Sequence, residues 1–143
     1  MIQAEERIER GSELTETQRA AIVFVSASAE DARAFRALAG GSRWLVVNVP
    51  DLTGARAVID KLRPRLVVCD TVIDGRGSWR DLLTGQCPGP RFAVIVVSRI
   101  ATEALRAEVL GLGGAGVLGM PFAVEEVARI LREASSEARP APY

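Results

Sequence analysis

The sequence predicts an α/β protein of the flavodoxin-like class, with a doubly wound, five-stranded parallel sheet built from five consecutive β-α units. Five short apolar runs recur at near-even spacing, and each is followed by a segment with helical periodicity. The runs are nearly continuous in apolar character, which is typical of strands buried on both faces. Right-handed crossovers then favour the strand order 2-1-3-4-5. The runs are Ala21–Val25, Trp44–Val49, Leu66–Cys69, Phe92–Val97 and Ala115–Leu118.

The segments between the apolar runs carry apolar side chains at helical spacing. In the second segment they fall at positions i, i+3, i+4 and i+7, namely Ala55, Val58, Ile59 and Leu62. Asp51 precedes this helix as its predicted N-cap, and Pro64 follows its end. The third helical segment, residues 79–83, is short. Its Trp79 is interpreted either as a core residue or as an anchor of a protein interface.

Composition and charge limit the classes of function. A chain of 143 residues suits one domain, and a net charge of zero gives no attraction to nucleic acid or to an anionic membrane. No apolar run approaches the ~20 residues of a membrane span. The chain has no histidine, which removes histidine-based catalysis and histidine-ligated metal sites. We therefore expect a cytoplasmic protein that is not an enzyme and binds neither nucleic acid nor membrane.

The composition also changes along the chain. Residues 1–19 are rich in Glu and Arg, and we expect them to form a polar N-terminal appendage. Residues 20–134 contain all five apolar runs and form the predicted domain. Residues 135–143 are rich in Pro, Ala and Ser, and they are predicted to be a flexible C-terminal tail.

The candidate site lies where the predicted strands end. In doubly wound sheets, ligands bind beyond the carboxyl ends of the strands, at the switch point between the first and third strands. This rule selects Ser26 and Ser28 after the first run and Asp70 after the third, with Ser98 and Met120 beside them. Two interpretations of the serine pair stay open: an anion-binding turn and the cap of the first helix.

These strand ends resemble those of the receiver domain of bacterial two-component response regulators, over roughly residues 20–134. The resemblance implies that Asp70 is the candidate phospho-acceptor, that Ser98 is the candidate switch hydroxyl and that the peptide bond before Pro121 is cis. Asp70 is interpreted either as a working acceptor or as a structural aspartate. The matching segments are Arg63–Asp70, Val94–Ser98 and Gly113–Phe122, of which the last resembles the stretch that ends in the family's Lys-Pro-Phe.

The chain departs from the family at the residues that handle charge. Transfer of a phosphoryl group to a carboxylate places anion beside anion, and the family offsets this with magnesium held by two acids at the end of the first strand. Here those two positions are Ser26 and Ala27, and Met120 stands where the family has a phosphate-contacting lysine. The single lysine, Lys61, belongs to the second helix. The resemblance therefore implies an atypical, degenerate receiver.

Two further expectations concern ions at this site. Magnesium is expected only if phosphorylation is retained, with Asp70 and Asp74 as weak candidate ligands; no other cofactor is expected. Arg99 follows the switch hydroxyl, where the family prefers a small residue. We expect its guanidinium to reach Asp70, pair with it and occupy the place of the phosphate.

The predicted function is that of a stand-alone receiver-like domain in bacterial phosphorelay signalling, or a fragment of a longer protein, that acts by binding proteins. A sensor histidine kinase and a downstream target are the expected partners. The alternative is a flavodoxin-like module that binds a nucleotide or flavin, although the short loops lack aromatic residues for ring stacking. A homodimer is expected through the fourth helix, fifth strand and fifth helix. The charged residues expected there are Arg106, Glu108, Glu125, Glu126, Arg129 and Arg132.

Overall fold

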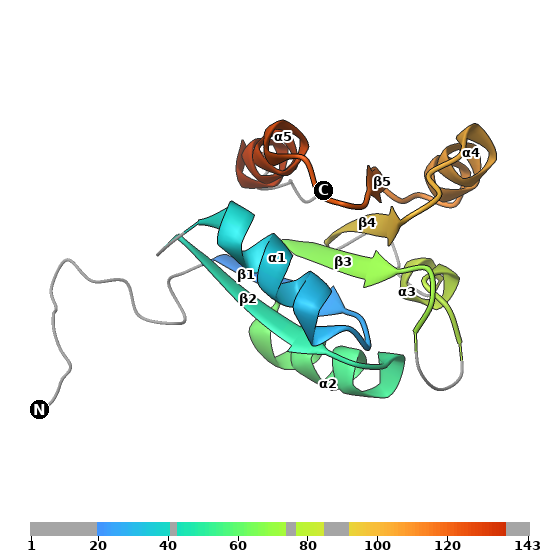
Figure 1. Cartoon of the computed structure of the whole chain (residues 1–143). Coiled ribbons are helices and arrows are strands. Elements are labelled where there is room, and N and C mark those ends of the chain that lie inside the picture. The colour runs from blue at the N-terminus through green and yellow to red at the C-terminus, as the bar shows by residue number, and fades with distance from the viewer. Residues whose placement is uncertain (1–19, 41–42, 74–76, 85–91, 137–143) are drawn as a thin grey trace, which may run out of the picture.

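The five predicted strands form one parallel sheet. The computed structural model describes residues 20–40, 43–73, 77–84 and 92–136. The sheet has the order β2-β1-β3-β4-β5, and every neighbouring pair is parallel (Figure 1). The predicted class and strand order are therefore confirmed. The strands are β1 Ala20–Val25, β2 Trp44–Val49, β3 Leu66–Asp70, β4 Ala93–Ser98 and β5 Gly116–Gly119.

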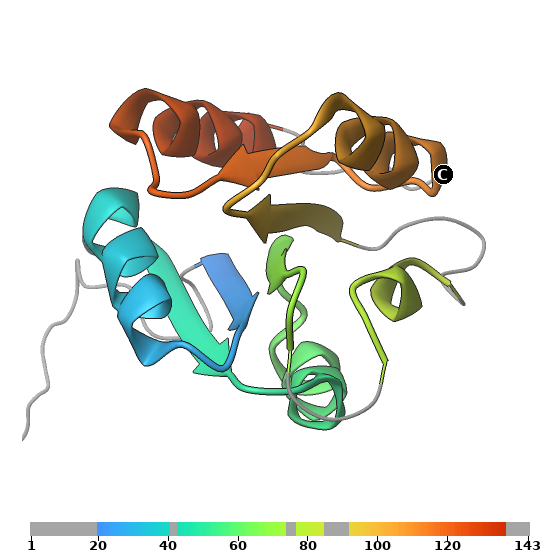
Figure 2. The same ribbon diagram turned by 45° about the vertical axis from the view of Figure 1, so that its right-hand side comes forward.

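The helices cover both faces of the sheet. Helices α1 and α5 contribute to one buried cluster, and α2, α3 and α4 contribute to the other. Figure 2 shows α1 and α5 on one side of the strands and α2 and α3 on the opposite side. This two-faced burial explains why the strand sequences are continuously apolar. The helices are α1 Ala29–Ala39, α2 Leu52–Leu62, α3 Arg80–Leu83, α4 Glu103–Gly111 and α5 Val124–Ser136.

Aromatic rings fill the core between α1, the sheet and the start of α5. The Phe24 and Phe35 ring centroids lie 5.4 Å apart. Phe122 meets both rings edge-on, at 6.3 Å from Phe24 and 5.8 Å from Phe35. Such tilted and edge-to-face pairs are favourable arrangements of aromatic side chains. The segment that follows β5 is thereby packed onto α1 and β1.

The opposite core contains Trp79, which is 2% exposed. The interpretation of Trp79 as an interface anchor is therefore wrong, because its indole packs inside the domain. The Arg80 guanidinium lies over the Trp79 ring, with its carbon 4.6 Å from the ring centroid. The same guanidinium pairs with Glu108 at 2.6 Å and joins α3 to α4. This pair holds the pKa of Glu108 below its usual range, mainly through the hydrogen bond from Arg80.

Side-chain caps begin three of the helices. Ser28 accepts a hydrogen bond from the backbone N–H of Asp31 at the start of α1, over 3.1 Å. The predicted N-cap Asp51 accepts from Gly54 N–H at 2.8 Å, which confirms its role at the start of α2. Thr102 caps α4 in the same way. These bonds satisfy N–H groups that the helices themselves leave unpaired.

The predicted segments at the two ends of the chain lie largely outside the described residues. Residues 1–19 lie outside the described residues, so the predicted appendage stays a prediction. The predicted boundary at residue 134 is too early, because α5 continues through Ser136; the rest of the predicted tail lies outside the described residues. Within the described ranges, no helix combines the length and apolar character that crossing a membrane requires.

Candidate functional site

The strand ends bring the predicted site residues to one edge of the sheet. The arrowheads of β2, β3 and β4 point to this edge in Figure 1. Val25 pairs with Cys69 in the β1–β3 register, so Ser26 and Asp70 are the next residues on two adjacent strands. Ser98 ends β4, and Met120 follows β5. The topological rule that selected these residues thus places them on neighbouring strands.

Asp70 is held by two neutral hydrogen-bond donors. The Ser26 hydroxyl donates to Asp70 Oδ2 over 3.2 Å, and the Val72 backbone N–H donates to Asp70 Oδ1 over 3.2 Å. Asp70 is half-buried, whereas Ser26 is 1% exposed. No lysine or arginine of the described ranges forms a salt bridge with Asp70. The carboxylate is therefore oriented by neutral donors without a neighbouring countercharge from these ranges.

The turn after β1 is fixed by hydrogen bonds within the protein. Ser26 Oγ accepts from the Ser28 N–H at 3.0 Å, while Ser28 Oγ is occupied as the cap of α1. The Asn48 side-chain amide donates to the carbonyl oxygens of Phe24 and Ser26, at 3.0 and 3.1 Å. These contacts favour helix capping over the anion-binding interpretation of the serine pair. Asn48 was not anticipated as a positioning residue.

The described residues at the strand ends do not fit a magnesium site. Magnesium prefers several oxygen ligands in octahedral geometry, with carboxylates to balance its charge. The described residues contain no group of three or more His, Cys, Asp or Glu side chains that could hold a metal. The Ser26 hydroxyl hydrogen is directed at Asp70, and the Ser26 carbonyl accepts from Asn48. Asp74, a weak candidate ligand, lies outside the described residues.

Ser98 is satisfied by its own loop. Its hydroxyl donates to the Ile100 carbonyl and accepts from the Ile100 N–H, with both distances 3.0 Å. Ser98 is buried, and none of its side-chain hydrogen bonds reaches Asp70. The geometry is that of a strand-end hydroxyl that shapes the turn into α4. Its role as a switch stays a prediction.

Arg99 does not contact Asp70 as expected. Its guanidinium Nη2 lies 3.5 Å from Asp31 Oδ2, in the first turn of α1. The Arg99 side chain is largely exposed, so its guanidinium keeps its hydration while it pairs with the Asp31 carboxylate. Exposed pairs of this kind contribute at most ~1 kcal/mol. The predicted Arg99–Asp70 pair is therefore replaced by a bridge between the β4–α4 loop and α1.

Apolar packing occupies the position where the family has a lysine. Met120 is half-buried and packs against the core between α1 and α5, while its N–H donates to the Ser98 carbonyl at 3.1 Å. The peptide bond between Met120 and Pro121 is cis, as predicted. Lys61 lies in the last turn of α2, on another element. Met120 therefore supplies no positive charge at the position where the family has its lysine.

Cys69 precedes Asp70 and is fully buried. Burial raises the pKa of its thiol to about 12, and the charge of Asp70 adds to the effect. The thiol donates to the Asp70 carbonyl oxygen at 3.4 Å. A thiol with this pKa is protonated at neutral pH, so Cys69 offers no nucleophilic thiolate to the site.

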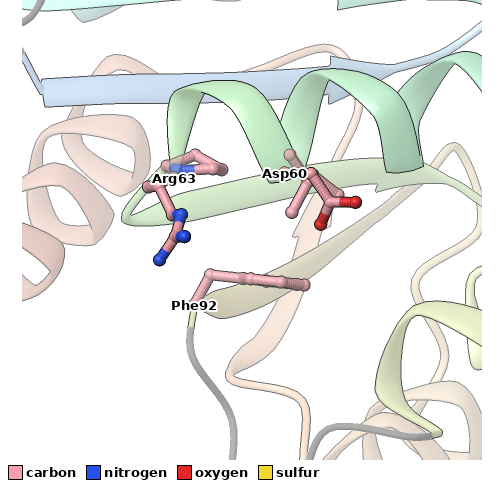
Figure 3. A pocket seen from close by; sticks show the side chains of 5 residues that line it. Asp60, Arg63 and Phe92 are labelled. Atoms are coloured by element: carbon pink, nitrogen blue, oxygen red, sulfur yellow. The ribbon is translucent and has the colours of Figure 1, made fainter.

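A cavity of about 300 Å³ lies near the amino ends of β3 and β4, away from the carboxyl ends of the strands. It opens between the end of α2 and the residue that precedes β4, where Asp60 and Arg63 lie above the Phe92 ring (Figure 3). Ile59 and Pro64 complete its lining. Flavodoxin-like sheets bind ligands at the carboxyl ends of their strands, so this cavity does not support the small-ligand alternative.

Comparisons with known proteins found similar solved structures but no matching family model or curated protein. Among solved structures, the chain is similar to a response regulator from Thermotoga maritima, with 16% identity and a TM-score of 0.73 over 83% of this chain and 99% of that one. It is also similar to the Francisella response regulator 1452 receiver domain, with 15% identity and a TM-score of 0.72 over 85% and 100%.

A third similar structure is the BeF3-activated N-terminal receiver domain of Klebsiella pneumoniae RstA. It has 24% identity and a TM-score of 0.66, over 78% of this chain and 95% of that one. All three similarities extend over most of both chains. The fold of this chain is therefore that of response regulator receiver domains, at low sequence identity.

Proposed function

We propose that this chain is an atypical receiver domain of bacterial two-component signalling that acts by binding proteins, without magnesium-dependent phosphorylation of Asp70. One observation carries the proposal: the buried group that faces Asp70 is the neutral hydroxyl of Ser26, at 3.2 Å. The receiver fold supplies the context, since similar solved structures are response regulators. The chain would act in the cytoplasm as a signalling module and not as an enzyme.

The charge balance at the strand ends supports this proposal. Phosphorylation would convert the singly charged carboxylate of Asp70 into an acyl phosphate that carries about two negative charges. Arg99, the cation that was expected to pair with Asp70, pairs with Asp31 instead. Without a metal or a lysine to oppose the new charge, both the transition state and the phosphorylated state lose electrostatic stabilisation.

Treatment with acetyl phosphate and magnesium tests the proposal directly. We expect the intact mass of the wild-type chain to stay unchanged under conditions that label an ordinary receiver domain, because no cation of the described residues pairs with Asp70. The Asp70→Asn variant is the control for labelling at other sites. A gain of one phosphoryl group that disappears in Asp70→Asn would contradict the proposal.

The protein-binding surface that we propose is formed by α4, β5 and α5. Arg106 faces β5, because its guanidinium donates to the Val117 carbonyl at 3.5 Å. Leu110, one helical turn later, is therefore on the same side of α4, and it is 53% exposed. We therefore place Leu110 in the apolar centre of the proposed interface, with the charged side chains of this surface at its periphery.

The predicted charges on this surface need two corrections. Arg106 is half-buried against β5 and not exposed as expected. Glu108 is exposed but pairs with Arg80 of α3, so it points away from β5. Arg129 pairs along its own helix with Glu133. Glu125, Glu126 and Arg132 are exposed as predicted.

We propose a homodimer through this surface and predict that Leu110→Glu weakens it. Placing a carboxylate at the centre of an interface removes about 1.5–3 kcal/mol of apolar burial and adds desolvation cost, so the dimer Kd should rise at least about tenfold. Sedimentation equilibrium measures the change, and Ala57→Glu on the exposed side of α2 is the matched control. A monomeric wild-type chain, or equal effects of both substitutions, would contradict the dimer.

A further inference from the structure

Exposed apolar side chains lie in the loops that follow β3, where Asp70 ends the strand, and its neighbouring strands. Val72 and Ile100 are 76% and 73% exposed, the highest values among the large apolar side chains that the structure describes. They follow β3 and β4, which are adjacent strands. Ala27 and Pro121 are exposed in the loops after the flanking strands β1 and β5. We call these four residues the apolar rim.

An apolar rim at this edge is not explained by the fold. Each loop that follows a strand is free to carry polar side chains, since its residues lie in water. Exposed apolar residues are unremarkable when scattered singly, but a group over neighbouring loops marks an interaction site. The two most exposed members, Val72 and Ile100, each lie two residues after a strand end, at Asp70 and Ser98 respectively. The rim therefore marks the site edge as a contact surface.

The Asp70 carboxylate has hydrogen-bond acceptor positions that the protein does not fill. An ionised carboxylate has about four acceptor positions, and Asp70 receives one hydrogen bond on each oxygen. Both donors are neutral, and the Arg99 guanidinium lies beside Asp31, 3.5 Å from its carboxylate. A half-buried anion that an apolar partner covers would lose water, so the partner must bring a donor with positive charge.

We propose that this edge binds a protein segment in which a lysine or arginine lies between apolar side chains, with the cation paired to Asp70 and the apolar residues on the rim. The proposal rests on the proposed function, because a phosphorylated Asp70 would not be free for this contact. A single carboxylate suits a monovalent side-chain cation, whereas a divalent metal ion needs more acidic ligands than the described site has. Charge complementarity also disfavours acidic or phosphorylated segments here.

Selection from a phage-displayed library of random 12-residue peptides tests the proposal on the full chain. We expect enriched peptides to share a Lys or Arg flanked by large apolar residues.

A synthetic peptide of the enriched sequence is then titrated by fluorescence polarisation. Asp70→Asn and Ile100→Glu should each weaken binding at least tenfold. Leu112→Glu, at an exposed leucine that ends α4 at the opposite edge of the sheet, is the matched control and should change binding less than twofold.

A double-mutant cycle identifies the charge pair. Replacing the peptide arginine by citrulline (or its lysine by norleucine) should cost tenfold with the wild-type chain and little with Asp70→Asn, because the partner is already absent. Enriched peptides without a cation, equal losses from citrulline in both chains, or no effect of Ile100→Glu would overturn the inference. So would Asp70-dependent self-association in sedimentation, which would make a second copy the occupant. Phosphoryl uptake from acetyl phosphate tests the proposed function separately.

Discussion

The variant Ser26→Asp with Ala27→Asp and Met120→Lys is expected to accept one phosphoryl group from acetyl phosphate in the presence of magnesium. The substitutions return the two acids and the cation to the positions that the receiver resemblance assigns to them. Ser26 already lies within hydrogen-bond distance of Asp70, so a carboxylate there would share a metal ion with it. Stabilisation of several kcal/mol by the metal corresponds to a rate gain of about a hundredfold or more over the wild-type chain.

Magnesium should also change the stability of this variant. A carboxylate at position 26 would be buried and would lie close to Asp70, so the two negative charges would repel each other in the absence of metal. Magnesium would relieve the repulsion and raise the Tm of the variant, because the folded state would bind the ion more tightly than the unfolded chain. The Tm of the wild-type chain should not respond.

Neutral side chains of similar size provide the control for this experiment. The variant Ser26→Asn with Ala27→Asn and Met120→Gln keeps the shape of the restored site but not its charges. It should neither take up a phosphoryl group nor gain stability with magnesium. If it behaved like the charged variant, or if adding Asp70→Asn left labelling intact, charge compensation at Asp70 would not be the missing element.

The architecture could be predicted because the sheet is buried on both faces. Each strand therefore reads as an apolar run, and the observed strands differ from the predicted runs by at most one residue at either end. The strand order then follows from connection rules, and it places Ser26 beside Asp70. The ends of helices depend on local contacts and were harder to predict from the sequence, as the continuation of α5 through Ser136 shows.

For the candidate site, the sequence predicted which residues lie at the strand ends but not which contacts their side chains make. The direction of a long side chain in a loop depends on neighbours that topology does not specify, which is why Arg99 was assigned to Asp70 and lies beside Asp31. Asn48 was missed for a similar reason. Its partners are backbone carbonyls of β1 and of the residue that follows it, and only the strand register reveals them. The sequence did contain one signal for Asn48, because it is the only polar side chain in the apolar run Trp44–Val49.

Stability of the strand-end region depends on the aromatic cluster behind it, and Phe35→Ala is expected to have the largest effect on unfolding of any single core truncation at α1. Phe35 is fully buried, and its ring contacts both Phe24 of β1 and Phe122 after the cis bond. Removing it leaves a cavity between three elements that cannot all move inward. The expected loss in the free energy of unfolding is about 3–5 kcal/mol.

Urea denaturation followed by far-ultraviolet circular dichroism measures this loss. Phe35→Leu is the graded control: it keeps most of the apolar volume and should cost roughly half as much or less. Leu112→Ala is the exposed control, with an expected change within about 0.5 kcal/mol. A loss below ~1 kcal/mol for Phe35→Ala would show that the ring is not packed between α1 and the start of α5. In that case the position of Met120 beside the site would need another support, because this cluster is what joins the segment after β5 to α1.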